Sequence, residues 1–359
     1  MLEKNNLLGF TQQQLNEFFS QIGEKPYRTR QLMQWVYHKE VYNFNDMLNL
    51  SKNLRSKLCS LASLDLPKVS KQNFASDGVI KWLLDLGCNN QIEMVYIPEN
   101  DRGTLCISSQ VGCSLACTFC STGMQGFNRN LKTEEIIAQV VIAKQYLSDN
   151  NKNISNVVFM GMGEPLLNEK AVFDACNILL DDMAFGLSRR KVTISTSGVV
   201  PALIRMAQKT PVSLAISLHA PDDELRDILV PINQKYPIKS LLEACNNYLN
   251  SGDQQRHILI EYVMLDGIND TFEHANKLVK LLKGMPTKVN LIPFNTFEKT
   301  QYKTSKTATI KHFQDILHKS GIRTMTRRTR GEGVDAACGQ LAGKVIDKSN
   351  RSLKNNGRN

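Results

Sequence analysis

The chain has 359 residues, 42% of them hydrophobic, and its 44 Lys and Arg against 34 Asp and Glu give a formal net charge of +10. No apolar run reaches the length of a membrane span and no basic-then-apolar leader opens the chain, so we expect a cytoplasmic protein without membrane contact. Nine cysteines in a reducing compartment favour metal-binding, catalytic or buried roles over a disulfide scaffold. The positive charge is compatible with a nucleic acid partner.

The first part of the chain, residues 1–66, shows apolar side chains at helical spacing. This spacing predicts a small all-helical module with helices at about Phe10–Ile22, Tyr27–Val41 and Leu50–Ala62. The second helix carries Arg28, Arg30 and Lys39. A basic edge of this kind suits RNA docking, and a plain packing role stays open.

Residues 67–100 predict a β-hairpin extension in which the turn Gly87–Asn90 joins strands Val79–Leu86 and Ile92–Ile97. In residues 101–335, strands then alternate with amphipathic helices, which predicts a parallel sheet covered by helices. Six such units are too few for a closed eight-fold barrel, so we expect an α/β fold with a partial (β/α)6 TIM-like barrel. Expected strands are Thr104–Ser108, Ile154–Met160, Lys191–Thr196, Val212–Leu218, His257–Val263 and Lys288–Ile292, with a short seventh at Ile322–Met325. Expected helices are Thr133–Leu147, Ala171–Leu180, Ile238–Leu249, Phe272–Leu282 and Ile310–Lys319.

Three cysteines lie close together after the first expected barrel strand, in the pattern Cys113-x-x-x-Cys117-x-x-Cys120. Thiolates at this spacing suit an iron–sulfur cluster or zinc. A cubane cluster held by three local thiolates keeps one iron open for a substrate. Two alternatives remain: a zinc site completed by a distant histidine, and a four-thiolate cluster completed by Cys106.

The motif and its place resemble the radical S-adenosylmethionine superfamily. The resemblance implies one [4Fe–4S] cluster on Cys113, Cys117 and Cys120, with S-adenosylmethionine bound at the open iron and cleaved to a 5′-deoxyadenosyl radical. It also implies that residues at the ends of later strands contact S-adenosylmethionine, where active sites of such barrels gather. The glycines of Gly161-Met-Gly-Glu-Pro165 would let the backbone approach this ligand. The expected contacts are Gly163, Glu164, Ser195, Ser217, Leu218, His219 and Asn295.

A further pair of cysteines stands outside this motif. Cys106 precedes it on the first expected strand, and Cys338 lies in a glycine-rich loop downstream of several arginines. Such surroundings suit a nucleophile with a lowered pKa, although a small buried thiol is the simpler interpretation. Residues 336–359 are thus expected to be a catalytic cysteine loop followed by a polar, basic tail that frays from Lys344.

The segments around Cys106, Gly161, Ser195 and Cys338 resemble the RlmN family of RNA methyltransferases along nearly the whole chain. This resemblance implies methylation of C2 of adenosine, at adenosine 2503 in the peptidyl transferase centre of 23S rRNA and at adenosine 37 of tRNA. Pro165 and Ser197 favour this family over its Cfr relatives, which methylate C8 of the same ribosomal adenosine.

The RlmN resemblance also implies residue roles. Cys338 would take a methyl group from one S-adenosylmethionine, and a second S-adenosylmethionine would supply the radical that activates this methyl for addition to RNA. Glu93 would accept the C2 proton, and Cys106 would release the product by forming a transient disulfide with Cys338. The family further implies a flavodoxin-type electron donor, and we expect a monomer. Alternatives are C8 methylation and a non-enzymatic iron–sulfur or zinc RNA-binding protein.

Overall fold

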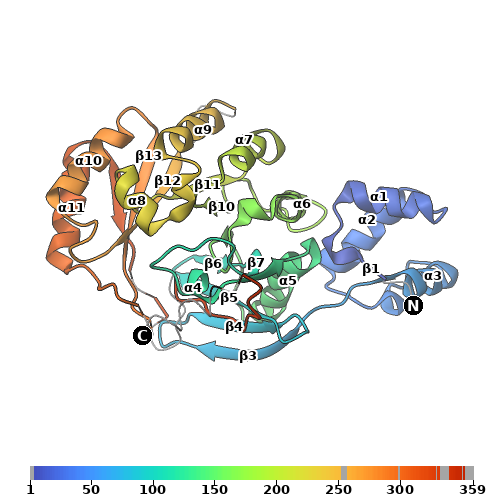
Figure 1. Cartoon of the computed structure of the whole chain (residues 1–359). Helices are drawn as coiled ribbons and strands as arrows, with labels where there is room; N and C mark the ends of the chain where they lie inside the picture. The colour runs from blue at the N-terminus through green and yellow to red at the C-terminus, as the bar shows by residue number, and fades with distance from the viewer. Residues whose placement is uncertain are drawn as a thin grey trace.

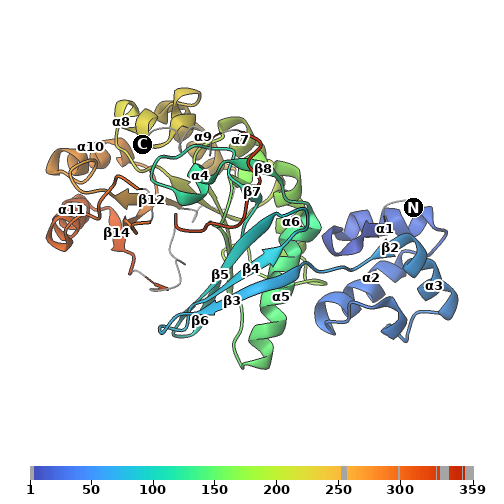
Figure 2. The same cartoon turned by 60° about the horizontal axis from the view of Figure 1, so that its bottom comes forward.

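The structure, a computed structural model, describes residues 4–251, 257–297, 300–328, 330–331, 339–349 and 351. Its main feature is a ten-stranded sheet in the order β14-β13-β12-β11-β10-β9-β6-β5-β4-β3 (Figures 1 and 2). Neighbours from β14 to β6 run parallel, and those from β6 to β3 run antiparallel. Among the described residues, no helix is long and apolar enough to cross a membrane.

The parallel part is the predicted partial barrel, in which helices separate successive strands. Its strands are β6 Arg102–Cys106, β9 Asn156–Phe159, β10 Val192–Thr196, β11 Ser213–Ser217, β12 Ile258–Met264, β13 Thr287–Pro293 and β14 Arg323–Thr326. Its helices are α5 Thr133–Asp149, α6 Glu169–Leu180, α7 Val200–Lys209, α8 Asp223–Leu229, α9 Ile238–Asn250, α10 Phe272–Leu282 and α11 Thr307–Lys319. Every expected strand and helix of the barrel is confirmed, including the short seventh strand, whereas α7 and α8 were not predicted.

The antiparallel part confirms the predicted hairpin as β4 Ile80–Asp85 and β5 Gln91–Glu99. One more strand, β3 Lys68–Phe74, forms the edge of the sheet and was not predicted. Most of its residues are exposed, so it lacks the apolar alternation that marks a half-buried strand. The three strands therefore extend the barrel sheet itself, as Figure 2 shows beside α5.

Three helices form where they were predicted, as α1 Gln12–Gln21, α2 Tyr27–Met33 and α3 Lys52–Leu61, and a π-helical turn Gln34–His38 continues α2. The module is not all-helical, because the short strands β1 Asn5–Asn6 and β2 Ala62–Ser63 pair within it. They lie beyond α5, at the opposite side of the molecule from α10 and α11 (Figure 1). The Lys144 ammonium on α5 donates to the Tyr37 carbonyl at 2.8 Å and pairs with Glu40 at 3.0 Å. Gly9 packs so closely on α5 that a Cβ there would lie 2.4 Å from the Glu134 backbone nitrogen. These contacts attach the helical module to the barrel.

The two faces of the sheet differ in chemistry. Residues such as Ile194, Ile216 and Ile260 are fully buried in the hydrophobic core. The alternate positions face the inside of the barrel and are smaller or polar, among them Ser195, Ser217 and Glu261. Side chains alternate between faces along a strand, so one face packs on the helices and the other is free to hold ligands.

Candidate active site

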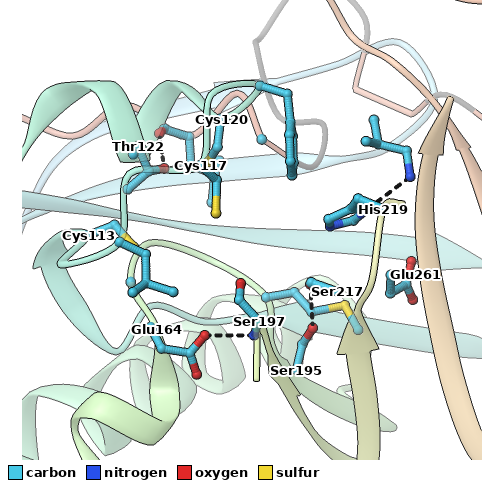
Figure 3. A pocket seen from close by; sticks show the side chains of 18 of the residues that line it. Cys113, Cys117, Cys120, Thr122, Glu164, Ser195, Ser197, Ser217, His219 and Glu261 are labelled. Atoms are coloured by element: carbon cyan, nitrogen blue, oxygen red, sulfur yellow. Dashed lines mark hydrogen bonds between the residues drawn. The ribbon is translucent and has the colours of Figure 1, made fainter. Parts of the chain in front are cut away.

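The three motif cysteines line one cavity at the carboxyl ends of the parallel strands, opposite Ser217, His219 and Glu261 (Figure 3). The short strands β7 Gln110–Gly112 and β8 Phe127–Asn130 pair below them, and α4 Ser121–Gln125 begins directly after Cys120. The Cys113 N–H donates to the Gly126 carbonyl at 2.8 Å. This ladder holds the ends of the cysteine loop together.

The donor set of this loop fits a cluster better than a single ion. Burial and the neighbouring thiols raise the pKa of Cys113, and burial raises the pKa of Cys117 to about 12. The three thiols are partly exposed to the cavity, and thiols that oppose one another's ionisation are stabilised as thiolates by a polynuclear cation. Cys106 is absent from the cavity lining, which does not favour a fourth thiolate ligand there.

The loop after β9 brings Gly163 and Glu164 to the cavity. Glu164 is buried, which raises its pKa, and its carboxylate accepts the N–H groups of Leu166 at 3.0 Å and Ser197 at 2.8 Å. A Cβ on Gly161 would lie 2.7 Å from the Ile107 carbonyl oxygen, and one on Gly163 would lie 2.5 Å from the Gln110 Cβ. These glycines allow the loop to pack against residues 107–110, and both also line the cavity, so the expected approach of a ligand to this backbone stays a prediction.

Ser195 and Ser217 end neighbouring strands β10 and β11, and their hydroxyl oxygens lie 3.4 Å apart (Figure 3). Below them, Arg226 on α8 is fully buried and donates to the carbonyls of Ser197, Ser217 and Leu218. Burial lowers the pKa of Arg226 to about 10, which leaves it charged at neutral pH. Arg226 thus fixes both strand ends. Arg226 could not be predicted, because a single arginine in a short helix belongs to no motif.

His219 lies in the cavity lining with φ at +61°, a conformation that is uncommon for a non-glycine residue. Its Nδ1 accepts the Val263 N–H at 3.0 Å, and its ring meets Phe119 edge-on at 4.6 Å. Burial and Arg226 lower its pKa to about 3. The imidazole is therefore neutral, and because Nδ1 accepts, Nε2 carries the proton that it can donate.

The two remaining residues that were expected to contact S-adenosylmethionine lie outside the cavity lining. Leu218 and Asn295 are not in the cavity lining; Leu218 is fully buried and offers its carbonyl to Arg226. Conversely, Glu261 on β12 lines the cavity and was not predicted. Burial raises its pKa, and the Asn290 amide donates to it at 3.1 Å. Glu261 sits on a strand of ordinary apolar pattern, where sequence reasoning had no reason to single it out.

The C-terminal segment, residues 339–349, crosses the cysteine loop and the end of β5 (Figure 1). The expectation that the tail frays from Lys344 is wrong for its described residues. The segment's carbonyls accept hydrogen bonds along its length, and polar composition alone does not reveal such backbone bonding. The donors are Ser121 N–H to Gly339, Thr122 Oγ1 to Leu341, Gln125 Nε2 to Gly343, Gln91 N–H to Lys344 and Asn128 Nδ2 to Ile346.

Arg351 binds the cysteine loop from the same side. Its guanidinium donates to the carbonyls of Cys113 at 3.1 Å, Leu115 at 2.6 Å, Gly123 at 2.9 Å and Ser114 at 3.0 Å. One fixed cation therefore gathers four carbonyls of the loop. Like the rest of the C-terminal segment, it was not recognised in the sequence.

Glu93 and Cys106 lie on neighbouring antiparallel strands. Cys106 stands opposite Val95, two residues from Glu93, so both side chains share the inner face of the sheet. Glu93 pairs with Lys81 at 3.1 Å and lines a second cavity, beside Ala342, Gly343 and Lys344. Cys338 lies outside the described residues, and the next residue, Gly339, lines the first cavity.

Two family models match the sequence. The ribosomal RNA large subunit methyltransferase N-terminal domain matches residues 5–64, and the radical SAM superfamily matches residues 107–282. The proteins named dual-specificity RNA methyltransferase RlmN from Ruthia magnifica subsp. Calyptogena magnifica and Vesicomyosocius okutanii subsp. Calyptogena okutanii are 68% and 66% identical to the chain. Each match covers 98% of this chain, with 99% and 98% of the relatives covered.

A solved structure agrees with these sequence matches. The crystal structure of a radical SAM methyltransferase from Sphaerobacter thermophilus aligns with a TM-score of 0.88 and 38% identity, over 94% of this chain and 99% of that one. The predicted radical SAM barrel is confirmed, as are the [4Fe–4S] cluster and S-adenosylmethionine that this superfamily uses. The non-enzymatic alternative is set aside. This chain belongs to the RlmN family of radical SAM RNA methyltransferases.

Proposed function

We propose that this protein methylates C2 of adenosine in two RNAs, at adenosine 2503 of 23S rRNA and at adenosine 37 of tRNA. The proposed dual specificity is supported by two relatives named as dual-specificity enzymes, which are 68% and 66% identical to the chain over nearly its full length. The site observation that carries the proposal is the shared inner face of Glu93 and Cys106, beside the cavity of the cysteine motif. This arrangement supplies both a base and a second thiol.

The chemistry of adenine explains why a radical enzyme is needed. C2 lies between two ring nitrogens and is electron-poor, so it is a weak nucleophile toward the methyl group of a sulfonium. When bound, the cluster and S-adenosylmethionine supply a 5′-deoxyadenosyl radical. The protein's own residues then have three tasks: to carry a methyl group, to accept the C2 proton and to release the product.

We assign the methyl carrier to Cys338, whose thiolate attacks the methyl carbon of S-adenosylmethionine, so that a new S–C bond forms as the sulfonium S–C bond breaks and S-adenosylhomocysteine leaves. The 5′-deoxyadenosyl radical would take a hydrogen atom from the methyl group on Cys338, and the methylene carbon left there adds to C2. Glu93 accepts the C2 proton, and the oxidised iron–sulfur cluster would take up the one electron that the adduct must lose to restore the aromatic ring. The Cys106 thiolate then attacks the Cys338 sulfur. The S–S bond forms as the C–S bond breaks, and its electron pair stays on the methylene carbon, which gains a proton to become the methyl group. A thiol reductant restores both cysteines.

The environment of Glu93 supports its role as a base. It is buried and lies 3.1 Å from the Lys81 ammonium, and one carboxylate oxygen accepts the Ala342 N–H at 2.9 Å. These two contacts hold the Glu93 carboxylate in one position on the inner face of the sheet.

C2 rather than C8 is supported by Pro165 and Ser197, which flank Glu164. Pro165 follows it directly, and the Ser197 N–H donates to its carboxylate. For the remaining partners, we propose a flavodoxin-type electron donor and a monomeric protein in the cytoplasm.

Nucleoside mass spectrometry of 23S rRNA and tRNA tests the proposal. RNA from cells that lack the protein should contain no 2-methyladenosine at either position, and the plasmid-borne gene should restore it. A Cys113→Ala variant expressed to the same level is the matched control and should not restore it. Appearance of 8-methyladenosine without the C2 product would favour the Cfr-like alternative and contradict the proposal.

A further inference from the structure

Two cations stand directly opposite each other on the last two strands of the barrel. Lys288 on β13 pairs in parallel register with Arg323 on β14. Paired residues of neighbouring strands point their side chains to the same face of a sheet, so the two positive charges lie side by side. Like charges in such positions oppose each other and destabilise the sheet. The pair therefore does not serve the stability of the fold.

No acidic group in the described part of the chain compensates this pair. Neither the Lys288 ammonium nor the Arg323 guanidinium forms a salt bridge or a side-chain hydrogen bond with a described residue. Burial and the neighbouring Arg323 lower the pKa of Lys288. By contrast, Arg205 on the helical side of the barrel pairs with Glu169 at 2.6 Å. Two cations left in this way suit an anion that comes from outside the chain.

The pair lies on the inner face of the barrel. Glu261 on β12, which lines the cavity of the cysteine motif, stands opposite Asn290 on β13, and Lys288 precedes Asn290 by two residues. Side chains two residues apart on one strand share a face and are separated by about 6.6 Å. The two cations therefore belong to the surface that holds the reaction cavity and not to the surface that the helices cover.

Further cations continue this surface along β14. Met325 and Arg327 follow Arg323 at alternate positions and share its face. The Arg327 N–H donates to β13 at 2.8 Å, so the ladder extends past the end of the strand. The positive charge of Arg327 also acts on Glu261, where it opposes the rise in pKa that burial causes. We call this group the basic rim; its members are Lys288, Arg323, Arg327 and Arg328.

The basic rim is accessible from outside the barrel. β14 ends the strand order at the side opposite β3, so no further strand covers it (Figure 2). Arg323 and Arg328 are exposed, and Met325 between them is 48% exposed. An extended polyanion can therefore contact the basic rim while another part of it reaches the cavity.

We propose that the basic rim binds backbone phosphates of the RNA substrate, next to the nucleotide that is methylated. The inference rests on the proposed function, because it assigns a contact to the RNA that this function methylates. Phosphates neutralise the opposed charges of Lys288 and Arg323, so a pair that weakens the free protein strengthens the complex. Phosphate contacts position a nucleic acid without reading its sequence, which suits the two different RNAs of the proposed function.

A double substitution tests the inference. Lys288→Met/Arg323→Gln removes the two opposed charges and keeps long side chains. Fluorescence anisotropy with an unmodified tRNA transcript should show several-fold weaker binding to the reconstituted enzyme, with the slope of log Kd against log salt smaller by about 1.5. The KM for this tRNA should rise in parallel.

The matched control is Lys209→Met/Arg190→Gln. It removes equal charge from exposed residues that precede β11 and β10, and it should bind the tRNA as the wild type does. Equal affinities and equal salt slopes for the two double variants would overturn the inference. Unchanged RNA affinity with slower reduction of the cluster by a flavodoxin-type donor would also overturn it, because the basic rim would then serve the donor.

Stability separates RNA binding from a structural role. Lys288→Met removes one of two opposed charges, so the RNA-free variant should melt at the wild-type temperature or above it. A lower melting temperature together with wild-type RNA affinity would show that Lys288 serves the fold and would overturn the inference. Absence of 2-methyladenosine in the wild-type reaction would instead contradict the proposed function and leave the binding result intact.

Discussion

The carboxylate of Glu93 accepts a hydrogen bond from the backbone N–H of Ala342 at 2.9 Å. This contact joins a residue of the antiparallel extension to the chain just beyond Cys338. It explains how residues far apart in sequence can act on one substrate: the C-terminal segment is bonded to β5 on one side and to the cysteine loop on the other.

Replacement of Glu93 by Gln should separate its structural role from its role as a base. The Gln carbonyl can still accept the Ala342 N–H, so the melting temperature should change little, but an amide cannot accept the C2 proton. We expect S-adenosylmethionine cleavage to continue while 2-methyladenosine formation falls by at least about 100-fold, the usual scale for loss of a general base. Both products are measured in one reaction by liquid chromatography. Unchanged methylation would exclude Glu93 as the proton acceptor.

Each motif cysteine should be required for the cluster. Cys113→Ala, Cys117→Ala and Cys120→Ala should lose the iron–sulfur absorbance band and most of their iron after anaerobic reconstitution, because three thiolates are the minimum offered here. Cys88→Ala, at an exposed turn, is the control and should reconstitute fully. A stable cluster in any of the three motif variants would show that another ligand set holds it.

Arg351 should stabilise the cluster from outside its ligand sphere. Arg351→Gln loses the cation that gathers the carbonyls of Cys113, Ser114, Leu115 and Gly123. The loop should then release iron to a chelator several-fold faster than in the wild type. Arg351→Lys should release iron at a rate between those of Arg351→Gln and the wild type, since an ammonium cannot match the planar fork of donors of a guanidinium.

The control variant for Arg351→Gln is Arg205→Gln. Arg205 is half-exposed and pairs with Glu169 on the helical side of the barrel, so its loss should leave iron release unchanged. Electron paramagnetic resonance of the reduced cluster gives a second readout, because a displaced loop alters the signal even where all three thiolates remain bound. Identical rates of iron release and identical spectra for Arg351→Gln and the wild type would show that Arg351 does not stabilise the cluster.

Arg226 should be a major source of local stability. Arg226→Met keeps much of the side-chain volume but leaves the carbonyls of Ser197, Ser217 and Leu218 without this donor inside the protein. Each buried group left unsatisfied costs about 1–3 kcal/mol, so we expect a loss of at least about 3 kcal/mol in the free energy of unfolding. Denaturant unfolding measures it. A loss below about 1 kcal/mol would mean that these carbonyls find other donors.

His219 should make the stability of the apoprotein depend on pH. Its pKa is about 3 when folded and near 6.5 when unfolded, so the unfolded chain binds a proton more readily. Its contribution is fully present above pH 6.5 and is lost as pH falls toward 3, by up to about 1.4 kcal/mol per pH unit. His219→Gln should flatten this slope. An equal slope in both proteins between pH 6.5 and 4.5 would show that His219 is not buried in its neutral form.

The barrel could be predicted because its signals are local. Buried parallel strands such as β9 and β12 and amphipathic helices such as α5 carry patterns set by burial, and the cysteine motif lies within a few residues. The exposed edge strand β3 lacks such a pattern, since none of its residues is buried.

The site residues that were not predicted were missed for a different reason. The roles of Arg226 and Glu261 depend on hydrogen bonds to carbonyl and amide groups of other elements, which only the fold brings close to them. The polar C-terminal segment resembles a loose tail by composition, yet its backbone and Arg351 are bound to the cysteine loop. Interactions of this kind depend on tertiary structure and leave no periodic trace in the sequence.

The central claim is that the methyl group reaches RNA through a cysteine of the protein. The most direct test is reaction of the Cys106→Ala variant with S-adenosylmethionine, reductant and RNA under anaerobic conditions, followed by denaturing electrophoresis and mass spectrometry. We predict a covalent protein–RNA adduct attached at Cys338 through one methylene group, and none when Cys338→Ala is added to the same variant. Formation of free 2-methyladenosine by Cys106→Ala without any adduct would contradict the account.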